Sequence, residues 1–177
     1  MANYWFISTK YRRSSKLALF TFALAFVVIL IGAYTRLTDA GLSCPDWPNC
    51  YGFLIAPHTS TQLQAAALKY PATEINIQKA WTEMTHRYFA GMEGVLIIVL
   101  ALSILLNQKA TDNRSLLIGI GLIILLATQV TLGMLTVTEK LYPGVVLAHL
   151  LVGVSILAML WWGYLNLNVH DDSFVQI

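Results

Sequence analysis

The sequence predicts an all-α integral membrane protein: a four-helix bundle with a long extracytoplasmic loop between its first and second helices. Only 11% of the 177 residues are charged and 57% are hydrophobic, whereas a soluble domain has about 25% charged residues. The apolar residues fall into four stretches, 17–35, 88–106, 115–137 and 145–165. Each is close to the roughly 20 residues that cross a bilayer. A soluble core does not explain this shortage of charge.

The first stretch is expected to stay in the membrane as a helix. It is longer than the apolar region of a signal peptide, and Gly-Ala-Tyr-Thr-Arg at its end is a poor cleavage site. The predicted organisation is therefore a cytoplasmic N-terminus over residues 1–16 and a transmembrane domain over residues 17–165. Residues 166–177, which are polar, are expected to form a frayed cytoplasmic tail.

The basic residues indicate the orientation. Cytoplasmic loops of membrane proteins carry an excess of Lys and Arg. Six of the eleven basic residues lie before the first stretch or between the second and third: Lys10, Arg12, Arg13, Lys16, Lys109 and Arg114. This density favours both termini in the cytoplasm of a bacterial cell, with the protein in the inner membrane. No basic aromatic patch is present, so no nucleic-acid partner is expected.

The loop over residues 36–87 is longer than a connection requires, which indicates a folded or functional segment. It begins with many turn-forming residues. A short amphipathic helix is expected from Thr61 to Tyr70, ending before Pro71. From Thr73 a helical pattern runs directly into the second apolar stretch.

Two histidines occupy similar depths in this topology. His86 precedes the second apolar stretch and His149 lies early in the fourth, and both stretches start at the extracytoplasmic side. Two imidazoles that face each other across a bundle can hold a haem iron axially, and the small residues Ala90 and Gly153 leave room nearby. The alternative is a polar hydrogen bond between helices. Because ionisable residues inside membranes are usually functional, haem is the favoured prediction.

Two carboxylates share the helical face of His86. Glu83 precedes it by three residues and Glu93 follows it by seven. Glu83 can orient the imidazole, accept a proton or act on a substrate, or it is a solvated residue at the membrane surface. Glu93 is expected to face the bundle interior, where it either titrates at a raised pKa or pairs with a polar group such as Gln129.

The only cysteines, Cys44 and Cys50, lie in the long loop. An oxidising compartment favours a disulfide between them, which is either a structural staple or a redox-active pair. A metal site is disfavoured because only His58 lies nearby as a further ligand. His58 in the loop and His170 in the tail are expected to bind no metal.

Arg36 and Arg87 flank the extracytoplasmic ends of the first two membrane helices. A guanidinium binds a carboxylate through two hydrogen bonds, so both residues are candidates to contact haem propionates. Lipid headgroups are the equal alternative.

Several of these segments together resemble the haem A synthase family. Gly-Ala-Tyr-Thr-Arg-Leu-Thr-Asp-Ala-Gly-Leu-Ser over residues 32–43, followed by Pro-Asp-Trp-Pro over 45–48, is similar to its first helix and outer loop. Glu-Met-Thr-His-Arg over residues 83–87 is similar to its E-x-x-H-R signature. Residues 129–133 and 143–153 resemble its third and fourth helices.

This resemblance implies an oxidoreductase that converts the C8 methyl group of haem O into a formyl group, for assembly of terminal oxidases. It implies that His86 and His149 flank the substrate haem, that Glu83 is catalytic, and that haem b is a cofactor. Cys44 and Cys50 match the cysteine pair that some members carry. Implied partners are membrane lipid, haem O synthase and cytochrome oxidase subunits.

The chain departs from the family in length. Members commonly have eight helices in two similar halves, and this sequence resembles the first half only. It is therefore expected to act as a homodimer or with a second four-helix half, or to be a truncated product. Two other functions are open: a haem carrier or assembly factor without catalysis, and a thiol oxidoreductase. The latter requires a further cysteine pair, which the sequence lacks.

Overall fold

The structure, a computed structural model, describes residues 2–107 and 113–172, with side chains described over residues 13–106 and 113–168. Its helices are α1 (Ala2–Leu37), α2 (Ser60–Lys69), α3 (Ile77–Asn107), α4 (Asn113–Thr138) and α5 (Pro143–Asp172). The described ranges contain no strand. All except α2 are long and apolar enough to cross a membrane, as the four apolar stretches predict. The chain is thus a multi-pass membrane protein.

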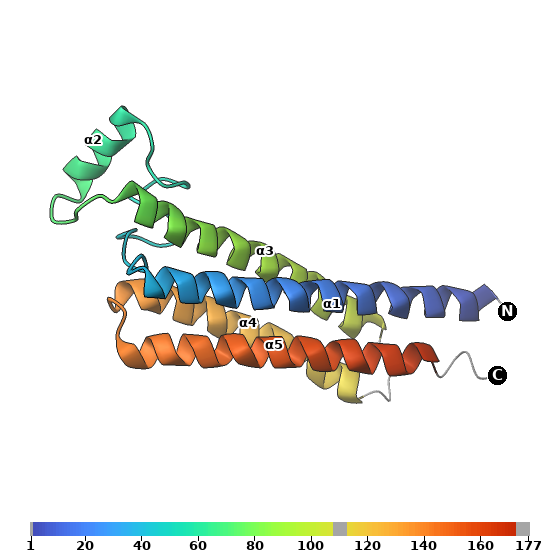
Figure 1. Ribbon diagram of the computed structural model, residues 1–177. Coiled ribbons are helices and arrows are strands. Elements are labelled where there is room, and N and C mark those ends of the chain that lie inside the picture. Colours follow the sequence, from blue (N-terminus) through green and yellow to red (C-terminus); the bar gives the residue numbers. More distant parts are fainter. Residues whose placement is uncertain (1, 108–112, 173–177) are drawn as a thin grey trace.

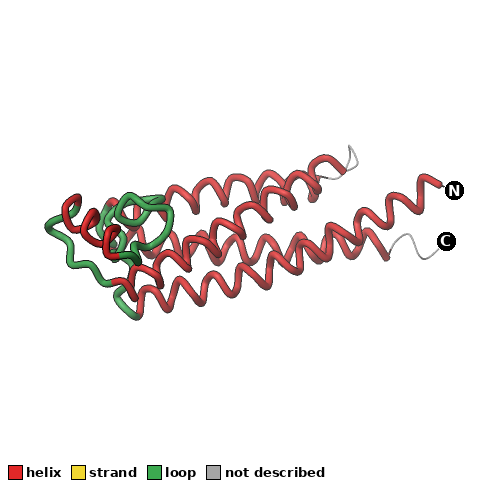
Figure 2. Tube along the Cα trace, turned by 90° about the horizontal axis from the view of Figure 1, so that it is seen from above, coloured by secondary structure: helices red, strands yellow, loops and turns green. Residues whose placement is uncertain are grey.

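The four long helices form a closed ring. Helix α1 packs against α3 and α5, and α4 packs against the same two helices. The pairs α1–α4 and α3–α5 therefore face each other diagonally across the bundle. Figure 1 shows the start of α1 and the end of α5 at one end of the bundle and α2 at the other. We call the end that carries residues 38–76 the loop end; Figure 2 shows the loops gathered there.

The segment between α1 and α3 is shorter than predicted, because α1 continues to Leu37 and α3 begins at Ile77. Helix α2 lies in this segment close to its predicted bounds. A capping box begins it: the Thr59 side chain accepts from the backbone N–H of Gln62, and the Gln62 side chain accepts from the backbone N–H of Thr59. These bonds satisfy backbone groups that a helix start otherwise leaves unpaired.

The prediction of a frayed tail after residue 165 is wrong for the part of the tail that the structure describes, since α5 continues to Asp172. Two polar side chains bind α5 to its neighbours. Asn166 donates to Ser115 Oγ on α4 at 3.1 Å, and Asn168 accepts from Ser15 Oγ on α1 at 2.6 Å. Leu167 between them is buried. Interhelical polar bonds of this kind hold membrane helices together.

The main apolar core occupies the half of the bundle away from the loop end. Its fully buried members come from all four long helices and include Ala18, Leu100, Ile118, Leu122 and Leu160. None of the residues in this core is a histidine, and the two predicted haem ligands lie in the other half. The bundle is thus divided into an apolar packing half and a half that contains the polar candidate site.

Candidate functional site

His86 and His149 lie on the two helices that oppose each other diagonally, α3 and α5. Both occupy the loop-end half of the bundle, and they are close enough for an electrostatic interaction between their rings. The structure therefore brings together the two histidines that the sequence pairs.

A glycine on an adjacent helix lies against each ring. A Cβ atom at Gly32 of α1 would lie 2.8 Å from Cε1 of His86, and one at Gly133 of α4 would lie 3.3 Å from Cε1 of His149. A contact of 2.8 Å is shorter than two carbon atoms tolerate. Each imidazole is therefore seated against the bare backbone of a neighbouring helix, which fixes its position.

Both rings carry a buried nitrogen without a hydrogen bond. Nδ1 of His86 and Nδ1 of His149 have no partner among the described residues. Leaving a buried polar atom unpaired costs about 1–3 kcal/mol, so two such atoms in the loop-end half of the bundle indicate a ligand. Neutral imidazole nitrogen is the commonest metal ligand that a side chain supplies. On this observation His86 and His149 fit a haem, whose iron they would hold.

No other metal site competes with this pair in the described part of the chain, where no group of three or more His, Cys, Asp or Glu side chains could hold an ion. His58 lies in the loop segment, exposed, with Nδ1 next to the carbonyl of Ala56 at 3.3 Å. The side chain of His170 lies outside the described residues. The expectation that neither binds metal stays a prediction.

Glu83, on the face of α3 that carries His86, is almost fully buried, with 4% of its surface exposed. One carboxylate oxygen, Oε1, pairs with Nη2 of Arg87 at 2.5 Å, and the other, Oε2, accepts from the backbone N–H of Cys44 at 2.8 Å. The alternative of a solvated surface residue is wrong. Glu83 is instead the point where α3 binds the loop that follows α1.

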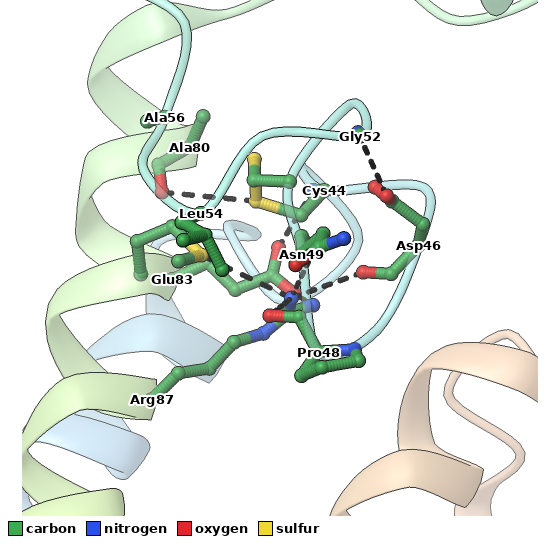
Figure 3. The surroundings of a disulfide bond; sticks show 12 residues. Cys44, Asp46, Pro48, Asn49, Gly52, Leu54, Ala56, Ala80, Glu83 and Arg87 are labelled. Carbon is green, nitrogen blue, oxygen red and sulfur yellow. Dashed lines mark hydrogen bonds and ion pairs between the residues drawn. A yellow bond between two sulfur atoms is a disulfide. The ribbon is translucent and has the colours of Figure 1, made fainter.

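Arg87 completes this attachment. Its Nη1 donates to the backbone carbonyls of Asp46, Pro48 and Asn49, at 3.0, 3.3 and 2.7 Å. Figure 3 shows its side chain reaching from α3 into the turn of the loop. One guanidinium thus binds Glu83 and three carbonyl groups of a single turn, which uses the fixed fork geometry of arginine.

The loop held in this way is closed by a disulfide between Cys44 and Cys50. Both cysteines are fully buried in a small second core at the loop end, together with Tyr51, Ala66 of α2 and Met84 of α3. The predicted disulfide is thus confirmed, and its burial in this core favours the role of a structural staple. Tyr88 adds a further attachment, since its hydroxyl donates to the carbonyl of Leu54 at 2.7 Å.

Tyr51 was not singled out by its sequence pattern. Its ring is buried and its hydroxyl has no partner among the described residues. Burial raises the pKa of this hydroxyl above its usual value, and the nearby carboxylates of Glu83 and Asp46 raise it further. Tyr51 therefore remains a neutral phenol beside the disulfide at physiological pH.

Arg36 lies in the last turn of α1, at the loop end. Its side chain is 57% exposed and pairs with Asp39 at 3.5 Å. The guanidinium of Arg87 is committed to the loop, so of the two arginines Arg36 is the one with a side chain open to an additional partner. Contact with a haem propionate stays a prediction for both.

The predicted pairing of Glu93 with Gln129 is wrong. Glu93 makes no hydrogen bond or ion pair with the described residues, and the amide of Gln129 lies instead beside His149, with the two Nε2 atoms 3.5 Å apart. Gly153 of α5 makes room for this amide, because a Cβ atom there would lie 3.1 Å from Nε2 of Gln129. The sequence did contain a signal for this contact: Gln129 is a single amide within an apolar helix, four residues before Gly133.

Comparison with known proteins gives a consistent result. Residues 15–175 match the family of cytochrome oxidase assembly proteins. A haem A synthase of Shewanella oneidensis is 44% identical over 160 residues, which are 88% of this chain and 47% of the relative. A haem A synthase of Lysinibacillus sphaericus is 30% identical over 132 residues, 72% of this chain and 36% of the relative. A protoheme IX farnesyltransferase of Haloarcula marismortui is 28% identical over 159 residues, 85% of this chain and 29% of the relative.

Proposed function

Because this chain belongs to the family of cytochrome oxidase assembly proteins, we propose that it is a haem-binding four-helix unit of a haem A synthase. In this role it oxidises the C8 methyl group of haem O to a formyl group, a four-electron oxidation that adds one oxygen atom and requires an external oxidant such as dioxygen. The observation that supports the proposal most strongly is the diagonal histidine pair. His86 and His149 each carry a buried nitrogen without a partner, in the half of the bundle that the main apolar core leaves free.

The chain spans about half the length of the curated relatives it matches. We therefore propose that a second four-helix half, supplied by a second copy of this chain, completes the enzyme. In such a homodimer one histidine pair would hold haem O and the other would hold a haem b cofactor, which would supply an iron that changes oxidation state. Membrane lipid surrounds the bundle. Haem O synthase and oxidase subunits are the proposed partners for delivery and use of haem.

The orientation follows from the same proposal. The start of α1 and the end of α5 lie at the end of the bundle opposite the loop end, so they face one side of the membrane. The density of basic residues near residues 10–16 and 109–114 supports a cytoplasmic location for that side, in a bacterial inner membrane. The disulfide loop then lies in the oxidising compartment, where such bonds persist.

The residues of this chain have separable roles in the proposed reaction. His86 and His149 would hold the haem, and Gly32 and Gly133 fix the position of their rings. Glu83 lies one turn before His86, within the protein rather than in solvent. Each oxygen of a carboxylate has more than one lone pair, so Glu83 can accept a proton while it keeps its bonds to Arg87 and Cys44.

Replacing Glu83 with glutamine tests whether the unit is catalytic. We expect Glu83→Gln to retain haem, since both histidines are intact, and to lose formylated product because glutamine is no proton acceptor. Product is measured by mass spectrometry of haem extracted from membranes supplied with haem O, including the fraction crosslinked as a dimer. Glu74→Gln, at an exposed glutamate of the loop segment, is the matched control and should form product normally.

Two results would contradict this assignment. Undiminished product in Glu83→Gln would remove Glu83 from catalysis. Haem binding without formylated product in the wild-type chain would leave a haem carrier instead of an enzyme.

Placing a methyl group at Gly32 is expected to weaken haem binding through His86. The Cβ atom of Gly32→Ala would meet Cε1 of His86 at 2.8 Å, so the ring must move. Because metal affinity changes about 10–100-fold when the groups that orient a ligand are lost, we expect a fall of that order. Gly91→Ala, where the added Cβ meets no atom within 4 Å, should bind haem as the wild type does. Equal haem affinity in both variants, measured by titration, would show that His86 is not fixed by Gly32.

A further inference from the structure

Glu93 is a carboxylate in the apolar part of the bundle to which the proposed reaction gives no role. It is the one Asp, Glu, Lys or Arg residue in the four apolar stretches of the sequence. Among the described residues no group forms a hydrogen bond or an ion pair with its carboxyl. Ionisable residues inside a membrane are costly and usually functional, so an unpaired carboxyl at this depth indicates a ligand that binds it.

Glu93 faces the interior of the bundle, on the same side of α3 as His86. The separation of seven residues is about 20° short of two helical turns and rises about 10 Å along the axis. Ile97 and Leu100, four and seven residues after Glu93, are buried in the main apolar core. Val95, on the opposite side of the helix, is 61% exposed. The carboxyl is therefore directed into the bundle and away from lipid.

Glu93 also marks the boundary between the main apolar core and the half of the bundle that contains the histidines. It is half-buried, whereas Ile97, one turn further along α3, is fully buried. Helical side chains lean toward the N-terminal end of their helix, so the carboxyl extends over the turn that carries the small residue Ala90. Glu93 thus lies deeper in the membrane than His86, at the inner limit of the candidate site.

The edge of a haem that would reach this depth differs between haem O and haem b. The two propionates of either haem are charged and would favour the loop end, near water, where Arg36 is open to a partner. The opposite edge would then face the deeper part of the bundle. In haem O that edge carries a hydroxyethylfarnesyl group with its hydroxyl beside the macrocycle, whereas haem b has a vinyl group there. A hydroxyl both donates and accepts hydrogen bonds, and a vinyl group does neither.

We propose that Glu93 is a specificity-determining residue: its carboxyl forms a hydrogen bond with the hydroxyl of haem O and so selects haem O over haem b. A site built to bind a hydroxyl disfavours a ligand that lacks it, because the buried polar group of the protein then stays unpaired. The inference rests on the proposed function, in which His86 and His149 would hold either haem. Haem b would bind between the same histidines without this bond.

Titration of the haem-free full chain with haem O and with haem b, followed by absorbance, measures the selection. We expect Glu93→Leu to weaken the binding of haem O by roughly 10-fold, because the hydroxyl loses its partner. The affinity for haem b should stay the same or rise. The farnesyl chain adds apolar contact in every variant, so the ratio of the two affinities is the quantity compared.

Two further variants separate the hydrogen bond from packing. Glu93→Gln keeps a side chain that donates and accepts, so it should retain most of the preference for haem O. Met92→Leu, at an exposed position next to Glu93, is the matched control and should change neither affinity.

Infrared spectra of the protein labelled with ¹³C-glutamate report on the bond itself. The bands of the Glu93 carboxyl are identified by their absence in Glu93→Gln. In the wild type we expect these bands to shift when haem O binds and to stay in place when haem b binds.

Equal weakening of both haems in Glu93→Leu would overturn the inference, since it would assign Glu93 to packing. An unchanged ratio of affinities, or the same infrared bands with either haem, would overturn it as well. These results are distinct from failure of the proposed function. Selective binding of haem O without formylated product would remove the catalysis and leave the selection standing, whereas a chain that binds neither haem would remove both.

Discussion

Replacing either His86 or His149 with alanine is expected to remove haem from the purified protein. Each substitution deletes one of the two axial ligands, and loss of the groups that only orient a ligand already costs about 10–100-fold in affinity. We therefore expect loss of the ligand itself to cost more than about 100-fold. Haem content per polypeptide and the reduced-minus-oxidised spectrum measure this effect.

The loop histidine provides the matched control for this result. His58 is exposed and lies outside the bundle, so His58→Ala should keep full haem content. Retention of haem in both His86→Ala and His149→Ala would show that the diagonal pair is not the binding site. Loss of haem in all three variants would point to a general defect in folding instead of a lost ligand.

Replacing Arg87 with methionine is expected to have the largest effect on stability. Arg87 and Glu83 have side chains that are only 12% and 5% exposed, and removing one partner of a buried ion pair costs about 3–5 kcal/mol. Arg87→Met also leaves three loop carbonyls without their donor. We expect residues 38–76 to become sensitive to protease and the Cys44–Cys50 disulfide to be reduced faster.

A double variant distinguishes the unpaired charge from the lost contacts. Glu83→Gln combined with Arg87→Met removes both charges and should recover part of the protection. Arg36→Met breaks an exposed pair with Asp39, where solvent leaves little stabilisation to lose, and should behave as the wild type. A protected loop in Arg87→Met would contradict the role of Arg87 as the attachment of the loop to α3.

The membrane helices and the histidine pair could be predicted because hydrophobicity and chain direction determine them. Four long apolar stretches require four crossings, and an even number of crossings starts α3 and α5 at the same end. These two facts predict that His86 and His149 lie at the same depth in the membrane, and no knowledge of side-chain packing is needed. The disulfide could be predicted equally well, since the sequence has only two cysteines and both lie in one loop.

The contacts around the site could not be predicted, because they depend on how one helix is rotated against another. Glu93 and Gln129 are both polar groups in apolar helices, and the sequence suggested that they pair. The structure instead directs Gln129 toward α5, where Gly153 provides space for its amide. Likewise, Arg87 binds a turn some 40 residues earlier in the chain, a contact that no local pattern reveals.

The continuation of α5 past residue 165 is a second contact-dependent feature that the sequence did not predict. Composition alone indicates a polar tail, but Asn166 and Asn168 are polar because they bind Ser115 and Ser15 on neighbouring helices. Polar residues near a helix end can thus be buried contacts between helices as well as solvent-facing groups. Only the arrangement of α1, α4 and α5 separates the two cases.

Electron paramagnetic resonance of the purified protein loaded with one equivalent of haem tests the central claim most directly. The account predicts a low-spin ferric signal of bis-imidazole type in the wild type, because His86 and His149 occupy both axial positions. It predicts conversion to a high-spin signal, or loss of the haem, in His86→Ala and in His149→Ala, with no change in His58→Ala. A high-spin iron in the wild type, or haem that separates from the protein on gel filtration, would contradict it.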